Sequence, residues 1–321
     1  MSVPALSIVV TGRNDGWGGD FNERFFATLA FNAARLAERE LAFELIFVEW
    51  NPVPGKPLLS ELLAREFPAL PGGVLRRFVA APGYAAAFTQ NRKVAFFEYI
   101  PKNAGIRRAA APLVLVTNAD VFLGREAIDA IATGRLARGT IYRAARYDID
   151  PAADRSTFNW DVLENPSLHL RRPVLKPPLF SGATGDFLLA HRQTFLELRG
   201  FNEVYRASRA GVDTNILIKA VTTGHAIADI GGPVYHINHE MSLREARGSH
   251  RATPTDTPWG NLRWHYRQVS YENPDNWGLA DAPARTREDG IVMLDFDWRA
   301  VPPLIELRRV VPAAHHLPAV P

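Results

Sequence analysis

Polar side chains follow three apolar segments of this sequence, at the point where each segment ends. The apolar segments span residues 6–11, 43–50 and 113–117, and their composition indicates strands. The polar residues at or just after their ends are Arg13, Asn14, Asp15, Glu49, Asn51, Asn118 and Asp120. The carboxyl ends of parallel strands meet at one edge of a sheet, and ligands of such folds bind there. We therefore expect these carboxylate, amide and guanidinium groups to converge at one edge of the sheet, where a ligand would bind.

The elements that must position these groups alternate in type along the first 230 residues. Nearly unbroken apolar runs indicate strands that are buried on both faces. Strands are expected at 6–11, 43–50, 74–79, 113–117, 140–147 and 187–190. Helices are expected at 22–39, 58–67, 191–198 and 212–223, with a helical stretch at 85–111 that is interrupted near Pro101 and Gly105. This alternation favours an α/β fold, a mostly parallel sheet flanked by helices.

Composition excludes several other classes of protein. The chain has 321 residues, of which 47% are hydrophobic and 22% are charged, so it is neither disordered nor fibrous. It contains no cysteine, which excludes a disulfide scaffold, thiolate catalysis and cysteine-ligated metals. The formal net charge is only +3, and the basic residues are scattered among nearly as many acids. We therefore expect no nucleic-acid partner, because such a partner calls for a basic stripe with interleaved aromatic residues.

The expected location follows from the lack of a membrane signal. No segment approaches the roughly 18 apolar residues needed to cross a bilayer, and the first residues lack the features of a signal peptide. We therefore expect no transmembrane segment and a cytoplasmic protein, or one peripheral to the membrane. The oligomeric state is left open, and a homo-oligomer is one alternative.

Five segments follow one another in a fixed order between residues 5 and 240. They are KNAGIRRA at 102–109, NAD at 118–120, SGATGDF at 181–187, RGFNE at 199–203 and GVDTNIL at 211–217. In residue types, order and spacing they resemble GT-A glycosyltransferases of the broad family 2 kind, which use nucleotide-diphosphate sugars. The resemblance implies a GT-A (Rossmann-like) fold with a C-terminal extension.

The sequence departs from the family pattern at three positions. Asn118 stands where the family has the first Asp of an Asp-x-Asp motif, which removes one negative charge from the metal site. Val212 stands where the family has the Glu of a Glu-Asp pair, so Asp213 remains as the acid. Arg199 replaces the first Gly of a Gly-Gly-Phe-Asp-Glu segment.

The resemblance further implies a divalent cation, Mn²⁺ or Mg²⁺, beside the diphosphate of the donor. Such cations prefer oxygen ligands and commonly need only one or two carboxylates, and Asp120 is the residue at the family's position. His236 and His239 offer a second ligand, because imidazole is acceptable to manganese. Simpler roles are open for all three: Asp120 as the cap of a helix expected near Arg125, and the histidines as hydrogen-bonded loop or core residues.

The catalytic candidates are Asp213 and Asp186. An acceptor hydroxyl must lose a proton as it attacks, and the resemblance places Asp213 as this general base. Capping of the helix that starts there is the alternative role for Asp213. Asp186 is a candidate for contacts to sugar hydroxyls, or a turn residue. The residues expected to bind the nucleotide sugar are Arg13, Asn14, Asp15, Glu49, Asn51, Lys102, Asn103, Arg107, Asn118 and Ala119.

The activity that the resemblance implies is transfer of a sugar from a nucleotide-diphosphate sugar to an acceptor hydroxyl. The enzyme would be a metal-dependent, inverting glycosyltransferase of the hexosyltransferase type, and its acceptor a glycan, a lipid or a small molecule. A non-catalytic nucleotide- or carbohydrate-binding protein on the same fold is an alternative that the departures at Asn118 and Val212 leave open. A nucleotidyltransferase is a second alternative, although its Gly-rich basic loop has no counterpart at 13–15.

Two units are expected along the chain. Residues 1–245 would form the catalytic domain, and residues 246–321 a C-terminal extension that packs on the core and ends in an irregular tail. Aromatic residues of the extension could stack on a sugar or pack against the core. They are Trp259, Trp264, Tyr266, Tyr271 and Trp277.

Overall fold

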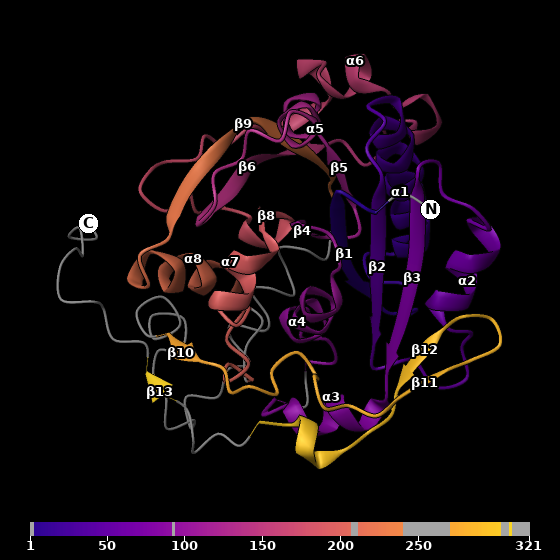
Figure 1. The fold of residues 1–321 in the computed structure, drawn as a ribbon. Helices are drawn as coiled ribbons and strands as arrows, with labels where there is room; N and C mark the ends of the chain where they lie inside the picture. The colour runs from indigo at the N-terminus through magenta and orange to yellow at the C-terminus, as the bar shows by residue number, and fades with distance from the viewer. Residues whose placement is uncertain (1–2, 92–93, 207–210, 240–269, 303–307, 310–321) are drawn as a thin grey trace.

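One large sheet organises the protein (Figure 1). The computed structural model describes residues 3–91, 94–206, 211–239, 270–302 and 308–309. The strands of the sheet are β1 (Leu6–Gly12), β2 (Phe43–Trp50), β3 (Gly73–Ala80), β4 (Leu113–Thr117), β5 (Val121–Leu123), β6 (Thr140–Ile149), β7 (His169–Arg171), β8 (Phe187–His191), β9 (Ala226–Ile237), β11 (Ala284–Thr286) and β12 (Val292–Leu294). Their order is β11-β12-β3-β2-β1-β4-β8-β6-β9-β5, and β7 pairs with β6.

The sheet has a parallel block and a mixed block. Strands β12, β3, β2, β1 and β4 are parallel to one another, and β11 is antiparallel to β12 at the edge of the sheet. Strand β8 is antiparallel to β4 and β6, while β6 is parallel to β9 and β5 is antiparallel to β9. Strands β1, β2 and β4 are buried along their whole length, as their apolar runs predicted.

Helices cover both faces of the sheet, so the predicted α/β fold class is confirmed (Figure 1). They are α1 (Phe21–Glu38), α2 (Leu59–Glu66), α3 (Pro82–Phe88), α4 (Tyr99–Arg108), α5 (Arg125–Ala132), α6 (Trp160–Leu163), α7 (Arg192–Glu197) and α8 (Val212–Thr222). Neighbouring side chains of β1 point to opposite faces: Val9 packs in the cluster with α3, α4, α7 and α8, whereas Ile8 and Val10 pack with α1, α2, α5 and α6. None of the described helices combines the length and the apolar character that crossing a membrane requires.

The helical stretch expected at 85–111 is interrupted at a different place from the one predicted. Helix α3 ends at Phe88 and α4 begins at Tyr99, so both Pro101 and Gly105 lie inside α4. Pro101 is in the first turn, where a backbone N–H has no partner within the helix and its absence costs little. A Cβ on Gly105 would lie 2.4 Å from Val9 Cγ1, so the glycine lets α4 pack closely on β1.

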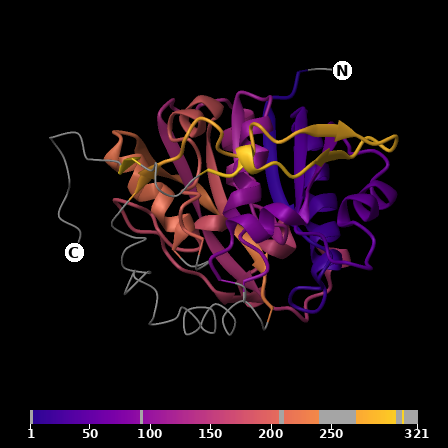
Figure 2. The same cartoon turned by 90° about the horizontal axis from the view of Figure 1, so that it is seen from below.

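Residues 270–302 cross the molecule from the side of α8 to the edge of the sheet (Figure 2). They begin with β10 (Tyr271–Glu272), which pairs with β13 (Arg308–Arg309), and they end beyond β12, which pairs with β3. Trp277 is buried in the apolar core, with the Arg107 guanidinium 5.2 Å from its ring centre. Trp259, Trp264, Tyr266 and the tail at 310–321 lie outside the described residues.

A buried polar network joins α4, α8 and the loop at 199–203. Asn103 donates hydrogen bonds to Phe201 O and Glu203 Oε1, both at 2.9 Å, and accepts one from Phe201 N at 2.8 Å. Lys219 donates to Gly200 O at 3.2 Å. Burial lowers the pKa of Lys219 to about 7, although the negative charge of Glu203 acts to raise it. Burial also raises the pKa of Glu203.

The depressed pKa of Lys219 predicts a pH dependence of stability. Between about pH 7 and the ordinary lysine pKa of 10.5, the unfolded chain keeps a proton that the folded chain has released. The folded state thus binds fewer protons in this window, and Lys219 makes stability rise with pH. Lys219→Met should flatten this rise when the free energy of unfolding in urea is measured at several pH values. Lys176→Met changes an exposed lysine and should keep the wild-type slope, and a wild-type slope in Lys219→Met would contradict the assignment.

Candidate active site

Asp120, His236 and His239 come together beyond the end of β4. Asp120 immediately precedes β5, and antiparallel pairing of β5 with β9 places Val121 opposite His236. Asp120 Oδ2 lies 3.6 Å from His236 Nε2 and 3.5 Å from His239 Nε2. All three candidate ligand atoms lie within 4.8 Å of one another. The structure therefore brings together the three residues that were predicted as metal ligands.

The charged groups of this cluster shift one another's pKa values. Burial raises the pKa of Asp120, but His236, Arg24 and His239 outweigh burial and hold that pKa well below its usual range. Burial lowers the pKa of His236, and the attraction of Asp120 and the hydrogen bond to Asp148 overcome this and raise it to about 9. Burial, together with Arg24 and His236, lowers the pKa of His239 to about 4. Asp120 is thus ionised and His239 neutral at pH 7.

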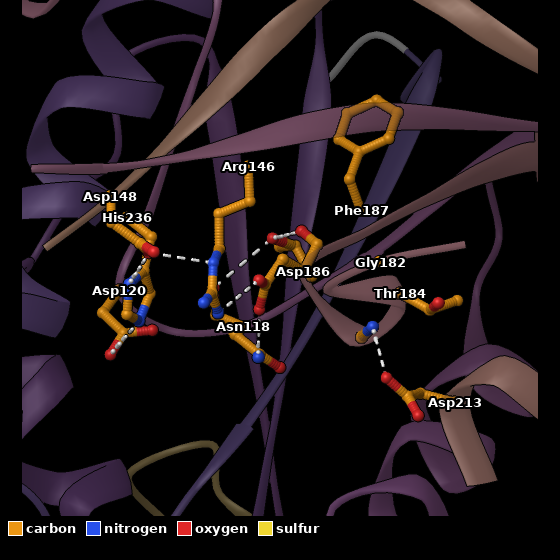
Figure 3. A network of polar contacts seen from close by, with 12 residues as sticks. Asn118, Asp120, Arg146, Asp148, Gly182, Thr184, Asp186, Phe187, Asp213 and His236 are labelled. Atoms are coloured by element: carbon orange, nitrogen blue, oxygen red, sulfur yellow. Dashed lines mark hydrogen bonds and ion pairs between the residues drawn. The ribbon is translucent and has the colours of Figure 1, made fainter. Parts of the chain in front are cut away.

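Asp148 contacts the ring nitrogen of His236 that faces away from Asp120 (Figure 3). Parallel pairing of β6 with β9 places Asp148 beside His236, and Asp148 Oδ1 lies 3.2 Å from His236 Nδ1. This contact turns Nε2 toward Asp120. Metal-binding histidines commonly have such a carboxylate on their other ring nitrogen, where it fixes the tautomer and orientation of the ring. The sequence analysis missed Asp148, because only the pairing of two strands far apart in the chain makes it a neighbour of His236.

Arg24 is a second residue that the sequence analysis missed. Its side chain is fully buried although it lies on α1, and its Nε is 3.4 Å from Asp120 Oδ2. The guanidinium also pairs with Asp20 and donates to Trp17 O at 2.9 Å and to Gly18 O at 3.4 Å. Arg24 therefore ties the glycine-rich loop at 16–19 to the Asp120 cluster.

A line of polar contacts continues from this cluster along the edge of the sheet (Figure 3). Arg146 lies 3.0 Å from both Asp148 Oδ1 and Asp186 Oδ2. Asn118 Nδ2 donates to Asp186 Oδ1 at 2.5 Å, and Asn118 Oδ1 accepts from Lys102 Nζ at 2.6 Å. The predicted residues Lys102, Asn118 and Asp186 are thus linked directly, and Arg146 connects them to Asp148 and His236.

Asp213 lies at the other end of this line, at the start of α8 (Figure 3). Its half-buried carboxylate accepts a hydrogen bond from Gly185 N at 3.2 Å and one from Thr214 N at 2.9 Å. Lys102 Nζ donates to Gly185 O at 3.0 Å, so Gly185 lies between Lys102 and Asp213. Burial raises the pKa of Asp213, and the nearby Glu98 raises it further.

The loop that carries Gly185 and Asp186 is held by a buried arginine. Arg143 of β6 is fully buried, and its guanidinium donates to Gly182 O at 2.8 Å, Thr184 O at 3.0 Å, Phe180 O at 3.4 Å and also to Phe187 O. Phe180 and Ala183 have φ values of 46° and 44°, in the left-handed region. The carbonyl contacts to Arg143 therefore stabilise a loop conformation that its own backbone disfavours.

The residues predicted to contact a nucleotide at the ends of β1 and β2 form hydrogen bonds with backbone groups of the protein. Arg13 and Asn51 both donate to Ala95 O, at 3.4 and 3.0 Å. Asn14 donates to Pro57 O at 2.9 Å, and Asp15 accepts from Trp17 N at 3.1 Å.

Four other predicted residues also bind within the protein. Glu49 is fully buried and accepts hydrogen bonds from Leu59 N and Ser60 N at the start of α2. Burial raises its pKa. Ala119 O accepts from Thr28 Oγ1 at 2.5 Å. Asn103 belongs to the buried network of α4 and α8, and Arg107 packs on Trp277, so the structure brings neither to the Asp120 cluster.

Comparison with known proteins finds similar structures but no similar sequences. No family model and no curated protein matches the chain. The chain is similar to a crystal structure of GalNAc-T7 with UDP, GalNAc and Mn²⁺, with a TM-score of 0.46 and 15% identity over 74% of this chain and 44% of that one. It is also similar to S. aureus TarS 1-349 in complex with UDP-GlcNAc, with a TM-score of 0.45 and 11% identity over 81% of this chain and 69% of that one. Both are GT-A glycosyltransferases, the class that the sequence resembles, and both likenesses concern the fold alone.

Close packing around Gly18 gives a prediction about the glycine-rich loop. Gly18 has a φ of +71°, and a Cβ there would lie 2.8 Å from His239 Nδ1 and 2.9 Å from an Arg24 nitrogen. Gly16 has a φ of +73° but no heavy atom of the described chain within 4 Å of such a Cβ. Both Gly→Ala changes should lose about 1–2 kcal/mol for the left-handed backbone.

Gly18→Ala should lose about 1–3 kcal/mol more, because the methyl group displaces His239 and Arg24. The free energy of unfolding of both variants, measured in urea, tests this difference. Equal losses in the two variants would show that the loop does not pack on the cluster as described.

Proposed function

We propose that this protein is a glycosyltransferase that moves a sugar from a nucleotide-diphosphate sugar to an acceptor hydroxyl, with inversion and with the help of a divalent cation. The observation that carries the proposal is the convergence of Asp120, His236 and His239 at the carboxyl edge of the parallel strands. A ligand of an open α/β sheet is expected at this edge.

The three side chains suit a divalent cation of the first transition series. One carboxylate oxygen and two imidazole nitrogens favour Mn²⁺ over Mg²⁺, which prefers oxygen ligands. The contact between His236 Nδ1 and Asp148 leaves Nε2 facing Asp120, which is the geometry of a supported ligand. A cation bound there would neutralise the negative charge that the departing diphosphate takes up.

Asp213 is the proposed general base. The acceptor oxygen forms a bond to the anomeric carbon, its proton passes to the Asp213 carboxylate, and the electron pair of the broken C–O bond leaves with the diphosphate. The raised pKa of Asp213, due to burial and to Glu98, brings its basicity closer to neutral pH. Asp186 and Lys102 lie between Asp213 and the cluster of Asp120, where they can hydrogen-bond the donor sugar and its phosphates.

One observation favours a second candidate function. Both oxygens of Asp213 accept backbone hydrogen bonds, from Gly185 N and Thr214 N, so the carboxylate can serve to hold the chain. It does not cap α8, because the N-cap of this helix is Gly211. A non-catalytic protein that binds a nucleotide sugar at the Asp120 cluster would need no base. The two candidates share the cation site and differ in the role of Asp213.

The cation site is tested by Asp120→Asn. The variant should bind nucleoside diphosphates in the presence of Mn²⁺ at least about tenfold more weakly than wild type, because the carboxylate is the only anionic ligand among the three residues. Titration calorimetry with UDP, GDP and ADP measures this. Asp281→Asn changes an exposed carboxylate and should bind as wild type does. Wild-type affinity in Asp120→Asn would place the cation elsewhere or remove it from the proposal.

The base is tested by Asp213→Asn, which nearly preserves shape. Release of nucleoside diphosphate from the donor should fall by about 10²–10⁴-fold, while the melting temperature and the affinity for nucleotide and Mn²⁺ stay near wild type. A purely structural role predicts turnover near that of wild type, because the Asn amide oxygen can still accept a backbone hydrogen bond from Gly185 N or Thr214 N. Turnover within about threefold of wild type would remove Asp213 from the mechanism and make Asp186 the next carboxylate to change.

A further inference from the structure

A permanent positive charge lies within the proposed cation site. The Arg24 guanidinium is fully buried, with its Nε 3.4 Å from Asp120 Oδ2, the same oxygen that faces His236 and His239. An arginine side chain does not lose its proton in proteins. A cation that binds Asp120 therefore always meets the charge of Arg24.

The other contacts of Arg24 hold it in the site. Its other nitrogens pair with Asp20 and donate to Trp17 O and Gly18 O, so three contacts besides Asp120 hold it in place. Asp20 is in turn paired with Arg155. The single carboxylate among the proposed ligands thus already faces a fixed cation, and Asp20 is shared between Arg24 and Arg155.

This arrangement disfavours a bare divalent cation and favours one that arrives with an anion. Two positive charges near one carboxylate repel each other strongly in a buried site, where solvent screens them little. A diphosphate group beside the cation supplies negative charge that both the cation and the guanidinium attract, and an arginine binds phosphate oxygens well.

We propose that Arg24 makes cation binding at Asp120 conditional on an anionic diphosphate, so that the cation and the diphosphate bind as a pair and the cation alone binds weakly. This inference rests on the proposed function of the site. It assigns Arg24 a positioning role, because the residue acts on the cation through Asp120 and through its own charge.

The experiment compares Mn²⁺ alone with its inorganic pyrophosphate complex, each titrated into the purified protein and followed by electron paramagnetic resonance of Mn²⁺ and by calorimetry. The wild type should bind the complex at least about tenfold more tightly than it binds Mn²⁺ alone. Arg24→Met should bind Mn²⁺ alone about tenfold more tightly than wild type and should lose most of the preference for the complex. Arg24→Lys keeps the charge and should keep that preference.

Folding of the variants is checked by circular dichroism and melting temperature. If Arg24→Met does not fold, Arg24→Gln is the replacement, since its amide can still donate to Asp120 and to the loop carbonyls. It should show the same tighter binding of Mn²⁺ alone.

The outcomes separate this inference from the proposed function. If the wild type binds neither Mn²⁺ nor the complex, the cation site itself is wrong and the inference is lost with it. If the wild type prefers the complex but the neutral variants bind Mn²⁺ alone no more tightly than wild type, the cation site stands and the role of Arg24 is overturned. Equal affinity of the wild type for Mn²⁺ and for the complex also overturns it.

Discussion

The buried charge of Asp120 is the constraint on which this side of the molecule depends. A carboxylate at the end of a fully buried strand is costly unless cations and hydrogen-bond donors compensate it. Arg24 and His236 provide that compensation, and each is itself buried and must be matched in turn. Asp20 matches Arg24, and Asp148 matches His236. The buried charge of Asp120 thus accounts for the charged partners on α1, β6 and β9, namely Arg24, Asp148 and His236.

The same requirement joins the two blocks of the sheet. Arg146 on β6 bridges Asp148 and Asp186, and Asp186 binds Asn118 at the end of β4. The parallel block supplies Asn118 and the mixed block supplies the other three residues. Polar contacts along the carboxyl edge therefore connect strands whose interior contacts are apolar, and they hold the groups with proposed chemistry in one line.

Sequence patterns predicted the fold well where burial is uniform and less well elsewhere. The runs at 43–50 and 113–117 match β2 and β4 residue for residue, because strands buried on both faces leave an unbroken apolar signal. Strand β9 gave no such signal, since its first eight residues are half-buried or exposed and include two glycines and a proline. Arg24 and Asp148 were missed because an arginine on a helix normally faces solvent, and no local pattern shows which strand pairs with which.

Two of the three departures from the glycosyltransferase pattern, Asn118 and Val212, have structural explanations. The Asn118 amide accepts a hydrogen bond from Lys102 and donates one to Asp186, and an aspartate in its place would face the Asp186 carboxylate with no proton to donate. Val212 is fully buried in the apolar cluster below α8, where a glutamate would carry a charge into the core. Asn118 and Val212 therefore both suit the residues around them, and Asp120 and Asp213 are retained beside them. With an amide at 118, Asp120 is the carboxylate of the proposed cation site, and the buried guanidinium of Arg24 beside it opposes the charge of a bare cation there.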